Sequence, residues 1–142
     1  SDKYDIIFDA KRWTSFEGNS GPYLMYSYAR CQSIVAKCIN SGLTGDLSSL
    51  GSLSSSYEHA LIYSLYRFHD VLVKAAQSYK PSLITTYLFQ LCKSFNRFYA
   101  NTSVLKAETE SLQRSRLALL QVFAKILKQG LFLLGITPPQ RM

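Results

Sequence analysis

The fold is decided by residues 117–134, which read LALLQVFAKILKQGLFLL. Apolar residues recur here at alternating steps of three and four, the period of an amphipathic helix, and further apolar residues widen the stripe. This helix is therefore predicted to be buried over more than half of its circumference. Gly135 is predicted to end it, and Pro138-Pro139 prevent it from resuming. The narrow stripe contains Leu117, Leu120, Ala124, Leu127, Leu131 and Leu134, and it is widened by Leu119, Val122, Ile126 and Leu133.

A second helix is predicted near the start of the chain. Pro22 follows the turn-forming residues 18–21 and suits the first turn of a helix, where its missing N–H is not needed. The helical pattern continues to about Cys38 and is stopped by Asn40-Ser41-Gly42. One face of this helix carries Leu24, Tyr28, Cys31 and Val35, and another carries Tyr23, Tyr26, Arg30, Ser33 and Lys37.

The middle of the chain predicts two or three more helices. Ser55 and Glu58 have the spacing of a capping box, which favours a helix over Tyr57–Phe68. A break at His69-Asp70, with Asp70 capping a continuation to about Tyr79, is compatible with the pattern. The next helix follows Lys80-Pro81-Ser82. Its apolar seam, again spaced by four and three, is Ile84, Leu88, Leu91, Phe95 and Phe98.

Residues 41–56 are rich in serine, glycine and leucine, with little periodicity. They are predicted to form a surface loop, and its length makes it the best candidate for a mobile element. Strand signals are nearly absent from the chain. The predicted fold class is all-α, an antiparallel helical bundle of four to five helices.

Composition limits the function without defining it. The chain has 142 residues, 47% of them apolar, and a net charge of +7. This apolar content excludes a disordered tail, and no apolar stretch is long enough to span a membrane. The first residues lack the apolar run of a signal peptide, so secretion is not expected. Residues 90–142 hold most of the charge excess, with eight basic against two acidic residues, which favours a polyanionic partner.

Side chains that could carry catalysis or bind a metal form no recognisable group in the sequence. Cys31, Cys38 and Cys92 lack the paired spacing of a zinc site and are expected to be reduced, buried or half-buried thiols. His59 and His69 have no partnered nucleophile, so neither a catalytic nor a metal site is predicted. Residues 18–21 before a helix are compatible with anion binding, but they lack the Lys-Ser/Thr ending of a P-loop.

Aromatic residues near the basic C-terminal part point to RNA. Lysine and arginine contact phosphates, and unpaired bases stack on aromatic faces. Phe95 and Phe98 fall on the apolar seam and are expected in the core. Tyr99 is offset from the seam near a helix end, so both an exposed and a buried position remain open for it.

Three segments together resemble one known family. Residues 15–30 read SFEGNSGPYLMYSYAR, residues 87–99 read YLFQLCKSFNRFY, and residues 134–142 read LGITPPQRM, with Ser115-Arg116-Leu117 and residues 128–131 between the last two segments. In order and spacing they resemble the C-terminal anticodon-binding domain of arginyl-tRNA synthetases, which are class I aminoacyl-tRNA synthetases. Met25, Ser27 and Gln140 depart from the family's usual Gln, Ala and Glu.

The resemblance implies roles for individual residues. Tyr99 matches a helix-end tyrosine that packs against an anticodon base, and Arg30 matches an arginine that contacts the anticodon loop. Arg141 and Met142 match a terminal pair that lies against the same loop. Arg97, a basic residue away from the apolar seam, joins the expected RNA contacts. A loop that shifts when tRNA docks corresponds to Ser15, Phe16, Glu17, Gly18, Asn19 and Ser20.

The resemblance also implies that the chain is part of a longer enzyme. Residues 1–21 are expected to join a catalytic domain that lies outside these residues, and residues 22–142 to form the anticodon-binding domain. The parent enzyme would charge tRNA(Arg) with arginine, using ATP and Mg²⁺, whereas this part needs no cofactor. The expected partners are the tRNA(Arg) anticodon stem-loop and the catalytic domain, without DNA or membrane, in the cytoplasm.

Two alternatives remain open from the sequence. The first is a non-catalytic helical domain that binds a protein, suggested by the apolar loop residues and the wide leucine stripe. The loop residues in question are Leu43, Leu47, Leu50 and Leu53. The second alternative is a stand-alone RNA-binding homologue that has lost catalysis.

Overall fold

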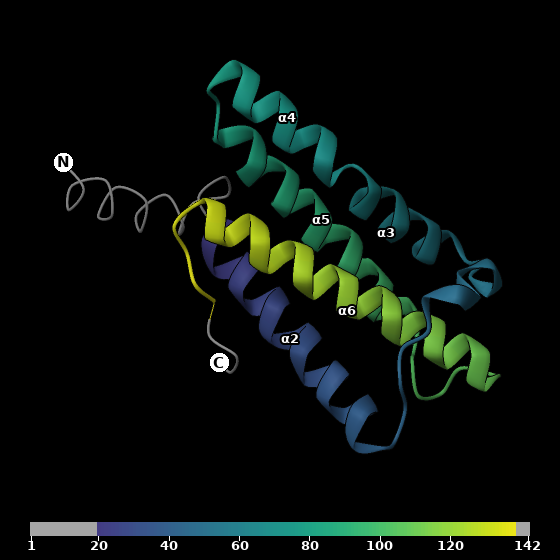
Figure 1. The fold of residues 1–142 in the computed structure, drawn as a ribbon. Helices are drawn as coiled ribbons and strands as arrows, with labels where there is room; N and C mark the ends of the chain where they lie inside the picture. The colour runs from purple at the N-terminus through teal and green to yellow at the C-terminus, as the bar shows by residue number, and fades with distance from the viewer. Residues whose placement is uncertain (1–19, 139–142) are drawn as a thin grey trace.

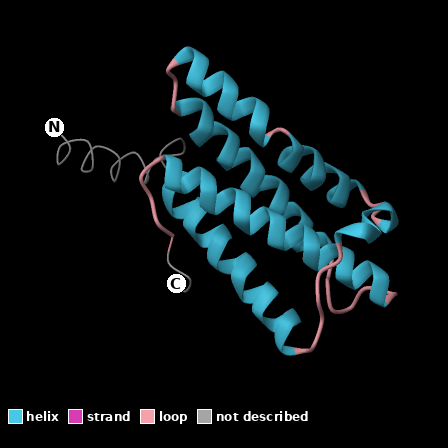
Figure 2. Ribbon diagram, viewed as in Figure 1, coloured by secondary structure: helices cyan, strands magenta, loops and turns pink. Residues whose placement is uncertain are grey.

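The computed structural model describes residues 20–138, and every regular element in that range is helical (Figures 1 and 2). The predicted all-α bundle is therefore confirmed. Helix α5 contacts each of the other four α-helices and lies at the centre of the bundle. Helix α2 packs against α5 and α6, while α3 and α4 follow one another along the other side of α5 (Figure 1). The elements are α2 (Ser20–Asn40), η1 (Leu47–Ser52), α3 (Ser56–Tyr66), α4 (Phe68–Ser78), α5 (Ser82–Asn101) and α6 (Glu110–Leu133).

The core forms where the predicted apolar faces of α2, α5 and α6 meet. Every residue of the predicted seam of α5 is buried, and so are Leu24, Tyr28, Cys31 and Val35 of α2. Phe95 and Phe123 stack across the contact between α5 and α6, with ring centroids 4.3 Å apart. Such burial of large apolar side chains is the main stabilising contribution to a bundle of this kind.

One apolar position of α6 was predicted wrongly. Leu133, expected in the widened stripe, is 54% exposed, whereas Leu131 is fully buried. Two residues turn an α-helix by about 200°, so Leu133 at the end of α6 points away from the core face that Leu131 occupies. Leu134, Val122 and Ile126 are half-buried at the margin of the stripe.

The helix boundaries follow local backbone chemistry. Ser55 and Glu58 make the predicted capping box, and Gly42 and Gly135 take positive φ values of 87° and 79° where α2 and α6 end. The break between α3 and α4 lies at Arg67 rather than at His69-Asp70. Asp70 does not cap α4 and lies in its first turn instead, where a carboxylate suits the helix dipole.

The segment 41–56 is more ordered than predicted. It contains the short 3₁₀ helix η1, capped by Asp46, whose side chain accepts a hydrogen bond from the Ser48 backbone N–H. Helix η1 packs on α6, and the Ser115 hydroxyl donates to the Ser49 carbonyl at 2.8 Å. Scattered leucines thus anchor the segment without making a helical period: Leu43 and Leu53 are buried, and Leu50 is half-buried.

A buried ion pair ties α3 to α6. Glu58 is 1% exposed, and its Oε2 accepts from Arg116 Nε at 2.6 Å, while its Oε1 accepts from the backbone N–H groups of Ser54 and Ser55. Burial alone would raise the pKa of Glu58, but these hydrogen bonds outweigh it and lower the pKa below the usual range. Arg116 also donates to the Ser103 carbonyl, so one guanidinium joins three segments.

The cysteines and histidines have structural surroundings. All three cysteines are buried and free, as expected for reduced thiols. Burial raises the pKa of the Cys92 thiol to about 12, which keeps it protonated and unreactive. His59 and His69 are exposed, and His59 Nε2 lies 3.0 Å from the Leu53 carbonyl oxygen.

Candidate nucleic-acid interface

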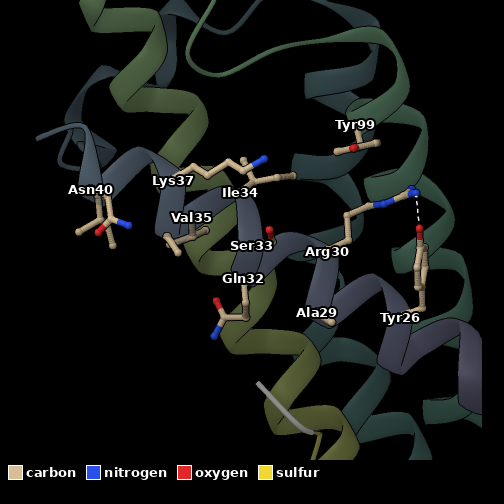
Figure 3. A pocket seen from close by; sticks show the side chains of 12 residues that line it. Tyr26, Ala29, Arg30, Gln32, Ser33, Ile34, Val35, Lys37, Asn40 and Tyr99 are labelled. Carbon is tan, nitrogen blue, oxygen red and sulfur yellow. Dashed lines mark hydrogen bonds between the residues drawn. The ribbon is translucent and has the colours of Figure 1, made fainter. Parts of the chain in front are cut away.

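A groove of about 840 Å³ runs along the exposed face of α2 and ends against α5 (Figure 3). Four of its lining residues, Tyr26, Arg30, Ser33 and Lys37, belong to the second helix face predicted from the sequence. They share this face because their spacings of four, three and four follow the helical period. Tyr99, near the end of α5, closes the groove on the other side.

Arg30 is the central cation of the groove. Its guanidinium carbon lies 4.7 Å from the centroid of the Tyr26 ring and 4.2 Å from that of Tyr99 (Figure 3). Both contacts are within the range of cation–π attraction. The guanidinium also donates from Nη2 to the Tyr26 hydroxyl at 2.7 Å and from Nη1 to Asn96 Oδ1 at 2.8 Å. A flexible side chain is thus held by three residues from two helices.

Tyr99 offers an aromatic surface at the mouth of the groove. It is 44% exposed, which decides between the two positions that the sequence left open. Its ring packs against the buried Phe95 with centroids 6.4 Å apart, while Arg30 covers part of the ring. The remaining exposed surface of the ring is available for stacking with a planar ligand.

The groove is electropositive. Arg30 and Lys37 line it, and none of its lining residues is acidic. Two basic residues outside the groove are paired with carboxylates: Arg114 with Glu110 and Arg116 with Glu58. Glu110 is already counted against the basic residues of segment 90–142, but Glu58 lies outside that segment, so the sequence charge count overstates by one the positive charge that the segment presents to a ligand.

The structure brings together only some of the residues predicted for RNA binding. Arg30 and Tyr99 meet in the groove, whereas Arg97 is exposed on α5 but does not line it. Ser20 is the first residue of α2. The other predicted residues lie outside the described range: Ser15, Phe16, Glu17, Gly18, Asn19, Arg141 and Met142.

Two further residues of this site had no role in the sequence prediction. Tyr26 lies on the helix face that the sequence predicts for it, and its spacing of four from Arg30 is the signal that links the two residues. Asn96 had no such signal, because its contact with Arg30 joins residues 66 positions apart. Within residues 20–138, no three metal-ligating side chains come together, and no helix is long and apolar enough to cross a bilayer.

Comparison with known proteins defines the class. Residues 24–142 match the family described as the DALR anticodon binding domain, and the chain belongs to this family.

Individual relatives agree with this assignment. The chain is 41% identical over 138 residues to a protein named arginine–tRNA ligase from Clostridium botulinum, covering 97% of the chain and 24% of that relative. It is 38% identical over 139 residues to one of the same name from Phocaeicola vulgatus, covering 97% of the chain and 23% of that relative. The structure is similar to arginyl-tRNA synthetase of Thermus thermophilus, with a TM-score of 0.77 and 36% identity, over 90% of this chain and 22% of that one. The chain thus spans about a quarter of the length of the curated relatives that it matches.

Proposed function

We propose that this chain is the anticodon-binding domain of an arginine–tRNA ligase and that its groove holds the anticodon loop of tRNA(Arg). The observation that carries the proposal is the arrangement of Arg30 between Tyr26 and Tyr99 in an electropositive groove of a DALR domain. Recognition of unpaired RNA needs both cations for phosphates and aromatic faces for bases. The groove supplies both, because Arg30 contacts the rings of Tyr26 and Tyr99, and Lys37 lines the same groove further along α2.

The proposed binding mode follows from the free surfaces in the groove. An unstacked anticodon base stacks on the exposed part of the Tyr99 ring. Arg30 donates its remaining N–H groups to a base edge or a phosphate oxygen, and Lys37, further along α2, contacts an RNA phosphate. Arg141 and Met142, together with residues 15–20, remain proposed contacts with the same loop on the strength of the family resemblance.

A titration of the chain with a fluorescently labelled tRNA(Arg) anticodon stem-loop tests the site. Arg30→Ala is expected to weaken binding by about tenfold or more, because a charge-assisted contact and the stacked arrangement are lost together. Arg67→Ala is the matched control, since Arg67 is an exposed arginine that lies outside the groove. Equal losses for the two variants would show that the groove is not the binding site.

The activity of the whole enzyme is part of the same proposal. Residues 1–21 join this domain to a catalytic domain, which binds ATP and Mg²⁺ and attaches arginine to the tRNA. The support is the family resemblance together with the names of relatives that are about four times as long. We also propose a cytoplasmic location for the whole ligase, because protein synthesis uses the charged tRNA there.

A competition experiment tests the identity of the RNA. Unlabelled tRNA(Arg) is expected to displace the labelled stem-loop, whereas an equal concentration of a tRNA with a different anticodon is not. If both displace it equally, the domain binds RNA without the proposed selectivity. The protein-binding alternative has lost its main support, because Leu43 and Leu53 are buried and Leu50 is half-buried within the chain, which leaves Leu47 as the one exposed leucine of the four.

A further inference from the structure

Asn96 lies between α2 and α5, one helical turn before Tyr99 on the same face of α5. Its Oδ1 accepts the hydrogen bond from Arg30 Nη1 at 2.8 Å. Its Nδ2 lies within hydrogen-bonding distance of three acceptors, the Tyr23 hydroxyl at 3.0 Å, Ser27 Oγ at 2.9 Å and the Cys92 carbonyl at 3.0 Å. The side chain is therefore bonded at both ends of its amide.

The partners allow only one orientation of this amide. The Arg30 guanidinium only donates hydrogen bonds, and the Cys92 carbonyl only accepts them. Turning the amide over would bring Nδ2 against the guanidinium and Oδ1 against the Cys92 carbonyl, losing both bonds. The Ser27 hydroxyl donates to the Tyr23 carbonyl at 2.8 Å, so Ser27 Oγ remains an acceptor for Asn96. The carbonyl oxygen of Asn96 is thus held towards Arg30.

Asn96 supplies a restraint that the aromatic rings do not. Tyr26 and Tyr99 fix where the guanidinium lies, but contact with a ring face leaves its rotation largely free. Hydrogen bonds donated from Nη1 and Nη2 fix that rotation, and of these two bonds the one to Asn96 joins Arg30 to a second helix. Among residues 20–138, these two bonds use two of the five N–H donors of Arg30, leaving three for a ligand in the groove that Arg30 lines.

We propose that Asn96 is a positioning residue for RNA recognition, which holds the Arg30 guanidinium in the rotation that presents its unused N–H groups to the groove. This inference rests on the proposed function, because the ligand of Arg30 is taken to be the anticodon loop. A guanidinium that is already oriented loses less side-chain entropy when the RNA binds. Asn96 therefore acts through Arg30 and contributes to affinity without needing to touch the RNA.

A double-mutant cycle with the tRNA(Arg) anticodon stem-loop tests whether Asn96 acts through Arg30. Asn96→Ala is expected to weaken binding by about tenfold in the parent chain and to have no further effect in an Arg30→Ala background. Asn96→Leu, which keeps much of the side-chain volume, is expected to give the same loss. Asn101→Ala is the matched control, because Asn101 is an exposed asparagine of α5 whose side chain donates to the Arg97 carbonyl and does not contact Arg30 within residues 20–138. Equal losses with and without Arg30, or no loss at all, would overturn the inference.

A measurement on the free protein separates this inference from the proposed function. In NMR spectra, rotation of the Arg30 guanidinium about its Cζ–Nε bond is expected to be slow in the parent and in Asn101→Ala. It is expected to be fast in Asn96→Ala and Asn96→Leu, at a temperature where circular dichroism shows all four proteins folded. Unchanged rotation in the Asn96 variants would refute the positioning role. Slow rotation in a parent chain that binds no RNA would leave that role standing and refute the proposed function instead.

Discussion

Replacement of Tyr99 by alanine removes the aromatic surface on which we expect an anticodon base to stack. A stacked base contributes about 1–3 kcal/mol, which corresponds to a loss of affinity of about 5- to 150-fold. A second loss comes from Arg30, whose guanidinium carbon lies 4.2 Å from the centre of this ring. Without the ring Arg30 is less well held, at a cost of about 0.5–1 kcal/mol. Tyr99→Ala is therefore expected to be more damaging than removal of one exposed charge.

Tyr99→Phe separates the ring from its hydroxyl. The Tyr99 hydroxyl makes no hydrogen bond within residues 20–138, and phenylalanine keeps the exposed stacking face. Its affinity for the anticodon stem-loop is expected to stay close to that of the parent. Tyr66→Ala is the matched control, because Tyr66 is 82% exposed on α3 and does not line the groove.

The assay is a fluorescence titration of the labelled stem-loop with each variant, at one salt concentration. Thermal unfolding followed by circular dichroism checks that each variant is folded at the assay temperature. We expect tight binding by the parent, Tyr99→Phe and Tyr66→Ala, and clearly weaker binding by Tyr99→Ala. Equal affinity of Tyr99→Ala and the parent would show that no base stacks on Tyr99 and would remove it from the site.

Three further predictions concern stability and electrostatics. Arg116→Met should lower the free energy of unfolding by about 3–5 kcal/mol, because it leaves buried Glu58 without its cation. The lowered pKa of Glu58 stabilises the fold above the usual glutamate range, and this stabilisation is lost as pH falls. Urea unfolding at several pH values should therefore show the difference between the parent and the variant shrinking in acid. Gly130→Ala should destabilise the fold by about 1 kcal/mol, because the new Cβ would lie 2.6 Å from Leu88 Cδ2 and this overpacking outweighs the better helix propensity of alanine. Gly51→Ala is the control: Gly51 has open space around it, so this change should not lower the thermal midpoint. RNA affinity should fall with salt by a slope of about 0.7 per neutralised phosphate, and a flat salt profile would show that the positive charge of the groove plays no part.

The helices and their buried faces were predictable because they depend on local periodicity. Phe95 and Phe98 lie on the face of α5 that is buried in the bundle core, as their spacing indicates, and the capping box of Ser55 and Glu58 places the start of α3. Each of these features is contained within a few residues of sequence. The position of the break at Arg67 was not predictable in the same way, because α3 and α4 each follow their own contacts with α5.

The structure of the loop 41–56 depends on contacts with residues far away in the sequence. Its leucines make no helical period: Leu43 and Leu53, on either side of η1, are buried, whereas Leu47 within η1 is 56% exposed. The hydrogen bond between Ser115 and the Ser49 carbonyl joins residues 66 positions apart. Side chains that pack over such separations leave no pattern within the segment itself.

The candidate site was predicted in part for the same reason. The face of α2 that carries Tyr26 and Arg30 could be read from helical spacing, and Tyr99 from its offset relative to the seam of α5. That Arg30 lies against Tyr99 and is bonded to Asn96 depends on how α2 packs on α5. The charge count suggested a polyanion but not which cations face it, because Arg116 is paired inside the bundle.

Binding of the anticodon loop in the groove between α2 and Tyr99 can be located without any substitution. The measurement is a map of backbone amide NMR shifts during titration with the tRNA(Arg) stem-loop. We predict that the largest shifts fall on residues 26–40 of α2 and 96–99 of α5, with little change along α4. Shifts concentrated on α3 and α4, with the groove residues unmoved, would show that the RNA binds elsewhere.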